Sequence, residues 1–80
     1  MENNFLEING IYALNYPDKD KLTRYVRVLN VFPNNFIEVW CREYVDFSLL
    51  RRSQFDMGLA KKMFLNLDQV ESLMELVLID

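Results

Sequence analysis

The stretch 22–32, with the sequence LTRYVRVLNVF, decides the fold. Its side chains alternate between two faces, and valine, threonine, tyrosine and phenylalanine dominate it. Residues of these types favour a pleated, half-buried backbone, and alternation with a period of two indicates a β-strand. The stretch therefore predicts a long strand with a mostly apolar face toward the core.

Two further strands flank this one. Residues 11–16, IYALNY, form an aromatic and aliphatic run that stops at Pro17, which cannot donate a hydrogen bond to a sheet. Residues 36–44, FIEVWCREY, follow the turn signal Pro-Asn-Asn at 33–35. Because both connections are short, 11–44 predicts a three-stranded antiparallel meander.

The second half of the chain is less regular. The stretch 45–60 fits two interpretations: a helix that ends at Gly58, or a third strand continuing through Phe47 and Leu49. Residues 61–67, KKMFLNL, predict a fourth strand.

The C-terminal stretch has a helical pattern. Residues 68–71, DQVE, have the spacing of a capping box. Apolar residues then recur at the spacing of one helix face, namely Val70, Leu73, Met74, Val77 and Leu78. This pattern predicts an amphipathic helix over 69–78.

Together these elements predict a single domain over residues 1–80 that is mainly β with a C-terminal helix. We expect four or five strands in a small antiparallel barrel or a strongly bent sheet. If 46–57 is helical, the alternative is an α+β fold with a three- to four-stranded antiparallel sheet and two helices.

Composition limits the chemistry. The chain has no histidine and a single cysteine, Cys41, so it lacks His-based acid–base catalysis, an intrachain disulfide and a Cys/His zinc site. Only two glycines are present, too few for a glycine-rich phosphate loop. We therefore expect no catalytic residues, no cofactor and no metal, and we predict that the protein is not an enzyme.

The chain shows no targeting or membrane signal. Its first ten residues, MENNFLEING, carry no lysine or arginine, and no apolar run approaches the length of a membrane span. A lone thiol is typical of a reducing compartment. We expect a soluble, cytoplasmic protein without membrane contact.

Three segments resemble the strands of Tudor domains and related SH3-like small barrels. They are YALNY at 12–16, RYVRVL at 24–29 and IEVWCREY at 37–44, with LNLD at 65–68 similar to the closing strand. The family's Tyr-Gly-Asn signature is missing, because Tyr44 is followed by valine and aspartate. The resemblance implies an SH3/Tudor-like barrel.

The same resemblance implies a ligand-binding aromatic cage. Tyr25, Trp40 and Tyr44 match the cage positions, with Tyr16 near the first of them and Asp46 as an orienting polar residue. Such a cage holds a methylated ammonium or guanidinium group by cation–π attraction. The alternative interpretation is that these rings pack in or beside the core.

Surplus hydrophobicity points to a binding function. The chain is 51% hydrophobic, more than a small core hides, and exposed apolar patches usually mark protein–protein contacts. We predict a non-catalytic protein-interaction module, a small cytoplasmic adaptor or inhibitor of bacterial or phage type that docks on another protein, with homo-oligomerisation possible.

The expected anchors are aromatic side chains or the apolar face of the C-terminal helix, since aromatic residues and arginine dominate binding hot spots. The first group is Tyr16, Tyr25, Trp40 and Tyr44, and the second is Leu73, Met74 and Val77. Arginines would orient the partner, namely Arg24, Arg27, Arg51 and Arg52.

The alternative function is a nucleic-acid-binding barrel in which bases stack on Tyr25 beside Arg24 and Arg27. The net charge of −3 makes nucleic acid the weaker candidate, because phosphate binding needs a basic face.

Overall fold

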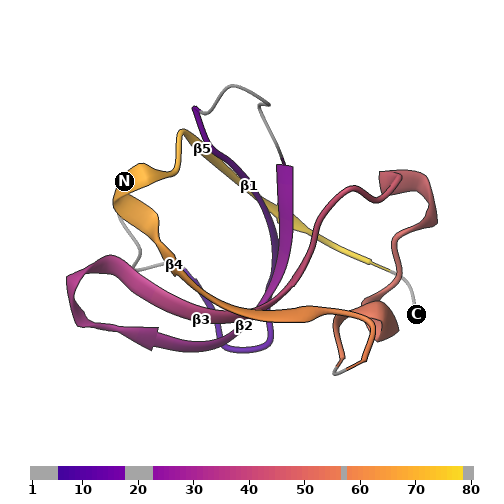
Figure 1. Cartoon of the computed structure of the whole chain (residues 1–80), viewed down its shortest axis with the longest axis horizontal. Helices are drawn as coiled ribbons and strands as arrows, with labels where there is room; N and C mark the ends of the chain where they lie inside the picture. Colours follow the sequence, from indigo (N-terminus) through magenta and orange to yellow (C-terminus); the bar gives the residue numbers. More distant parts are fainter. Residues whose placement is uncertain (1–5, 18–22, 57, 79–80) are drawn as a thin grey trace.

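The computed structural model describes residues 6–17, 23–56 and 58–78. Its described part is mainly β, with five strands in one antiparallel sheet of order β4-β3-β2-β1-β5 (Figure 1). The strands are β1 (Ile11–Asn15), β2 (Thr23–Phe32), β3 (Phe36–Arg42), β4 (Lys61–Asn66) and β5 (Ser72–Leu76). Short 3-10 turns connect them, namely η1 (Pro33–Asn35), η2 (Phe47–Leu49), η3 (Arg52–Phe55) and η4 (Leu67–Gln69).

The four strands predicted from the sequence are confirmed. β1 pairs with β2 from Ile11 opposite Arg27 to Asn15 opposite Thr23, and β2 pairs with β3 out to Phe32 opposite Phe36. The register shifts between Val28 and Asn30, which places a bulge in β2. Because a bulge increases the bend and twist of a strand, β2 can pair with both β1 and β3 in a curved sheet.

The predicted C-terminal helix over 69–78 is wrong. The backbone there leaves η4 at Gln69, and 72–76 forms β5, which pairs antiparallel with β1 from Ile11 opposite Leu76 to Asn15 opposite Ser72. This pairing hydrogen-bonds the second edge of the buried strand β1, which a helix cannot do. Alternation also places Leu73 on one face of the sheet and Leu76 on the other, so both are partly buried.

The closed barrel and the two-helix alternative are also wrong. β4 and β5 are the two outer strands and do not pair with each other, so the described sheet is open. The ambiguous stretch 45–60 contains only the 3-10 turns η2 and η3, separated by extended backbone at Leu50 and Arg51. No α-helix occurs in 6–17, 23–56 or 58–78.

The sheet is buried on both sides around β1. On its concave side lies the inner core, formed by the buried residues Tyr12, Leu14, Val26, Val28, Ile37, Val39, Cys41, Leu65, Leu67 and Val70. On its convex side lies the outer cluster, in which Ile11, Leu50 and Phe55 are buried and Tyr25, Trp40, Val45, Leu76 and Leu78 pack against them. Four consecutive β1 residues, 11–14, are therefore at most 6% exposed.

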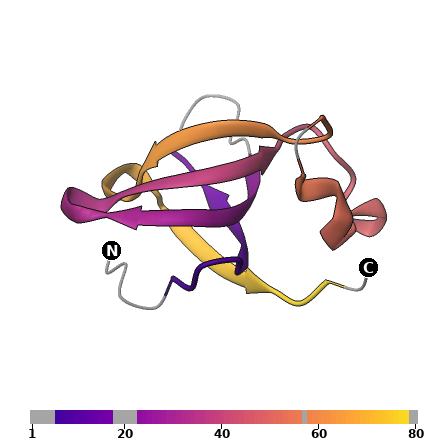
Figure 2. The ribbon, with the colours of Figure 1, turned by 90° about the horizontal axis from the view of Figure 1, so that it is seen from below.

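The segment 45–56, here called the covering segment, supplies the buried Leu50 and Phe55 of the outer cluster. Its turns η2 and η3 lie at the end of the molecule opposite the β2–β3 turn (Figure 2). Asp46 begins η2 by accepting hydrogen bonds from the Ser48 backbone N–H at 3.0 Å and the Ser48 hydroxyl at 2.9 Å. These bonds hold the pKa of the Asp46 carboxyl below its usual value.

We expect Phe55→Ala to lower the free energy of unfolding by about 3 to 5 kcal/mol, because it empties the centre of the outer cluster. The matched control is Phe64→Ala on β4, which changes stability by about 0.5 kcal/mol or less because surface substitutions cost little. Phe55 is fully buried, whereas Phe64 is 63% exposed. Urea denaturation measures both, and equal losses would show that the covering segment does not pack as described.

Candidate functional site

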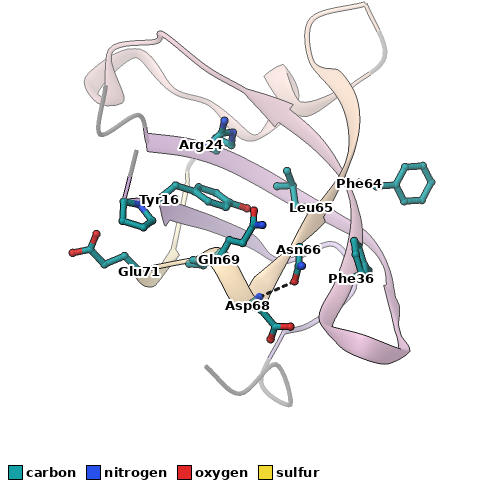
Figure 3. Close-up of a pocket in the computed structure, with 11 residues that line it drawn as sticks. Tyr16, Arg24, Phe36, Phe64, Leu65, Asn66, Asp68, Gln69 and Glu71 are labelled. Atoms are coloured by element: carbon teal, nitrogen blue, oxygen red, sulfur yellow. Dashed lines mark hydrogen bonds between the residues drawn. The ribbon is translucent and has the colours of Figure 1, made fainter. Parts of the chain in front are cut away.

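A groove of about 720 Å³ opens beside the end of β4, where the sheet fails to close (Figure 3). One wall comes from the end of β1 and the start of β2, with Tyr16, Pro17 and Arg24. The other comes from β4, η4 and the residues that follow it, and Phe36 of β3 completes the rim. Segments distant in the sequence therefore meet around one concave site, the usual setting for a ligand.

Tyr16 and Arg24 form the polar centre of the first wall. The guanidinium carbon of Arg24 lies 4.5 Å from the centre of the Tyr16 ring, within the range of cation–π attraction. Arg24 Nε also lies 3.8 Å from Glu43 Oε1, so the Arg24 guanidinium has a carboxylate close to it. The arginine is thus held in place by a ring on one side and a carboxylate on the other.

The Tyr16 hydroxyl is buried and has no hydrogen-bond partner among the described residues. Burial raises the pKa of Tyr16, an effect that the nearby Arg24 charge opposes and Cys41 adds to. The phenol therefore stays protonated at neutral pH and keeps an unused donor close to the groove.

Hydrogen bonds hold the second wall in shape. Asn66 Oδ1 accepts from the Asp68 backbone N–H at 2.9 Å, and the Val70 N–H donates to the Leu67 carbonyl at 3.1 Å. The Glu71 N–H then donates to the Asn15 carbonyl of β1 at 2.7 Å, which ties this wall to the first. The groove is therefore bounded by backbone with fixed hydrogen bonds.

The rim of the second wall is acidic. Asp68 Oδ1 accepts from Asn35 Nδ2 at 2.6 Å, but the ion pairs found among the described residues include neither Asp68 nor Glu71. Gln69 lies between these two carboxylates and carries an amide with both donors and acceptors. The rim thus offers two uncompensated negative charges beside aromatic surface.

The lining is suited to holding a ligand by contact. Tyr16 provides aromatic surface, and Asn66 and Gln69 provide amides. Phe36 and Phe64 lie at the rim, and the Phe64 ring points away from the other lining residues (Figure 3). Within the described residues, no group of three or more cysteines, aspartates or glutamates is placed to hold a metal ion. Burial, with the Glu43 carboxylate adding to it, raises the pKa of the Cys41 thiol to about 12, so this thiol stays protonated and unreactive at neutral pH.

The structure does not bring the four cage candidates together. Tyr25 and Trp40 are half-buried in the outer cluster, on the convex side of the sheet, whereas Tyr16 packs against the inner core on the concave side. The Tyr25 ring lies 6.0 Å from the Phe47 ring, and Lys62 Nζ lies 5.3 Å from the Trp40 ring. Tyr44 is 83% exposed.

The predicted arginine face is also divided. Arg24 lies in the groove, but Arg27 is on the convex side, where its guanidinium meets the Asp56 carboxylate at 3.3 Å. Arg51 donates to the carbonyls of Ser48 and Leu50, and Arg52 donates to the Asn9 carbonyl at 2.7 Å. Three of the four arginines therefore contact or belong to the covering segment, and this arrangement does not favour a nucleic-acid surface, which needs its cations on one face.

The residues of the predicted apolar helix face at the C-terminus do not lie on one side, because 72–76 forms the strand β5. Leu73 packs against the inner core, Met74 is 61% exposed on the other face, and Val77 beyond β5 is 92% exposed. These residues do not form one surface. In contrast, Phe36, Gln69 and Glu71 line the groove and were not expected from the sequence. These three residues come together only because β1, β4 and η4 lie side by side around the groove. No local sequence pattern predicts that arrangement.

Comparison with protein-family models, characterised protein sequences and solved structures finds no match to this chain. The resemblance to Tudor and SH3-like domains therefore stays a prediction. Among the described residues, no helix is long and apolar enough to span a membrane.

Tyr44 has an unusual backbone conformation, with a φ of 59° where the chain leaves β3 for the covering segment. This left-handed region costs a residue with a Cβ about 1 to 2 kcal/mol. We expect Tyr44→Gly to raise the free energy of unfolding by about 0.5 to 1 kcal/mol, since the relief exceeds the entropy cost of glycine.

Tyr44→Ala is the control, because it removes the exposed ring but keeps the Cβ. Thermal or urea unfolding should show no gain for the alanine variant. Equal stabilities of the two variants would contradict strain at this position.

Proposed function

We propose that this protein is a non-catalytic interaction module that holds an extended segment of a partner protein in the groove. The observation that carries the proposal is the groove itself, in which Tyr16 and Phe36 provide apolar contact beside the fixed guanidinium of Arg24. An extended segment fits because its alternate side chains enter a groove while its backbone remains free to hydrogen-bond with the walls. The Tyr16 ring supports this, because it lines the groove and lies against the Arg24 guanidinium.

The charges of the groove suggest the chemistry of the partner. Glu43 partly balances Arg24, whereas the rim carboxylates of Asp68 and Glu71 lack an ion pair among the described residues. A partner segment with a lysine or arginine next to apolar residues would complement the rim, and such rim charges mainly increase the rate of association.

A module of this kind acts as an adaptor, or as an inhibitor when the segment it covers is needed elsewhere. We also propose a cytoplasmic location, which the single buried thiol supports. Binding of this type involves no catalytic step. It requires only that the groove walls keep their shape.

Peptide selection followed by NMR tests the proposal. A library of linear random peptides should yield binders that contain a basic residue beside apolar ones. Titration of a selected peptide should shift the backbone amides of the groove, at 16, 24 and 66–71, more than those of the outer cluster. We expect Gln69→Trp, which fills the groove, to abolish binding, and Glu71→Lys to weaken it about threefold to tenfold.

Glu75→Lys is the matched control, since it makes the same charge change at an exposed residue of β5 outside the groove. It should leave the dissociation constant within about twofold of the wild type. Binding that maps to another surface, or that survives Gln69→Trp, would overturn the proposal.

A further inference from the structure

β4 is an outer strand whose second edge has no partner in the described sheet. Beside this edge, on the convex side, lie three exposed aromatic residues that we call the phenylalanine patch: Phe32, Phe36 and Phe64, which are 38%, 43% and 63% exposed. Phe36 and Phe64 also line the groove, so the patch and the groove adjoin. The rings of Phe32 and Phe64 are 6.1 Å apart. The covering segment packs on the convex side, at the end of the molecule opposite the β2–β3 turn (Figure 2). An exposed, apolar edge strand is a template for pairing with another strand.

The charges along β4 are ordered. The strand begins with Lys61 and Lys62, continues with Met63, Phe64 and Leu65, and is followed by Asp68 two residues after its end. Lys62 lies 3.7 Å from Glu38, whereas the ion pairs of the described residues do not include Lys61. The strand is thus positive at one end, apolar in the middle and negative just beyond the other end.

We infer that two copies of this chain associate by antiparallel pairing of their β4 strands. In an antiparallel pair the positive end of each strand meets the negative end of the other. In the register derived below, Lys61 comes opposite Leu67 of the second copy, one position from its Asp68. Parallel pairing would instead bring like charges together. This self-complementary order of charge is what singles out a second copy as the occupant of the edge.

The faces of the strand fix the register. Phe64 and Lys62 pair with Glu38 and Trp40 of β3, respectively, and so share the convex face. For the convex faces of both copies to lie on the same side, each residue must pair with one of the same parity. Pairing centred on Phe64 satisfies this rule, places the two Phe64 rings side by side and uses residues 62–66 of both strands.

The other free edge is less suited to self-pairing. The only charged residues in β5 and at the position before it are the acids Glu71 and Glu75. Pairing two antiparallel β5 strands would therefore bring negative charges close together. Pairing of β4 with β5 of another copy would match opposite charges, but such a contact is heterologous and builds polymers instead of a closed dimer. The mass in solution therefore distinguishes these arrangements.

Sedimentation velocity over a range of concentrations at low ionic strength tests the inference. We expect the mass to rise with concentration from 9.6 kDa to twice that value and no further. Lys61→Glu should weaken dimerisation about tenfold, because each charge occurs twice in a two-fold symmetric dimer. Asp68→Lys should weaken it similarly, and the double variant should recover most of the wild-type affinity.

Glu71→Lys is the control that separates this dimer from the groove, because it should weaken peptide binding and leave the mass unchanged. A 9.6 kDa species at every concentration would overturn the inference. So would polymers that disappear in Glu75→Lys, since these would place β5 in the contact.

Cross-linking tests the register in a Cys41→Ala background, which removes the natural thiol. Directly opposite residues of an antiparallel pair have Cα atoms about 4.5 to 5.5 Å apart, a distance that a disulfide spans. Phe64→Cys should therefore form a covalent dimer on mild oxidation. Lys61→Cys should not, because its two copies are six positions apart in this register, about 20 Å along the strand. The reverse pattern would overturn the proposed pairing.

Discussion

The structure depends on the burial of β1 from both sides. Strands of an antiparallel sheet usually have one face in the core and one in water, but Ile11–Leu14 are buried on both. Tyr12 and Leu14 pack into the inner core, while Ile11 packs into the outer cluster under the covering segment. β1 is also paired along both edges, with β2 and β5. A five-residue strand thereby connects the curved sheet, the covering segment and the C-terminal strand.

The two-sided burial of β1 explains the contacts of several other side chains. Arg27, Arg42 and Arg52 contact Asp56, the Gln54 carbonyl and the Asn9 carbonyl, so they hold the covering segment against the sheet. Gly10 leaves space for the Tyr12 ring, which lies 2.8 Å from where a Cβ would be. Two features remain outside this framework: the groove between β1 and η4, and the free edge of β4. The two adjoin, because Phe64, Leu65 and Asn66 of β4 also line the groove.

The sequence predicted the strands better than the site. Period-two alternation and the turn signals at 17 and 33–35 located β1, β2, β3 and β4, because these signals are local. The C-terminal stretch misled because Val70, Leu73, Met74 and Val77 fit helical spacing, while the pairing of β5 with β1 is a contact over about 60 residues that no local pattern records. Of the residues predicted for the site, Tyr16 and Arg24 line the groove, whereas Tyr25 and Trp40 pack in the outer cluster. The side on which an aromatic residue lies depends on the bend and pairing of the sheet, which alternation alone does not give.

Native-state hydrogen exchange of the β1 amides tests the two-sided burial of this strand most directly. The account predicts that the hydrogen-bonded amides of 11–14 exchange only by global unfolding, with the same free energy that denaturant unfolding gives. They should be at least as protected as the amides of β3, although β1 is the shorter strand. Exchange of β1 at a clearly lower free energy than β3 would show that this strand opens locally, and would contradict the account.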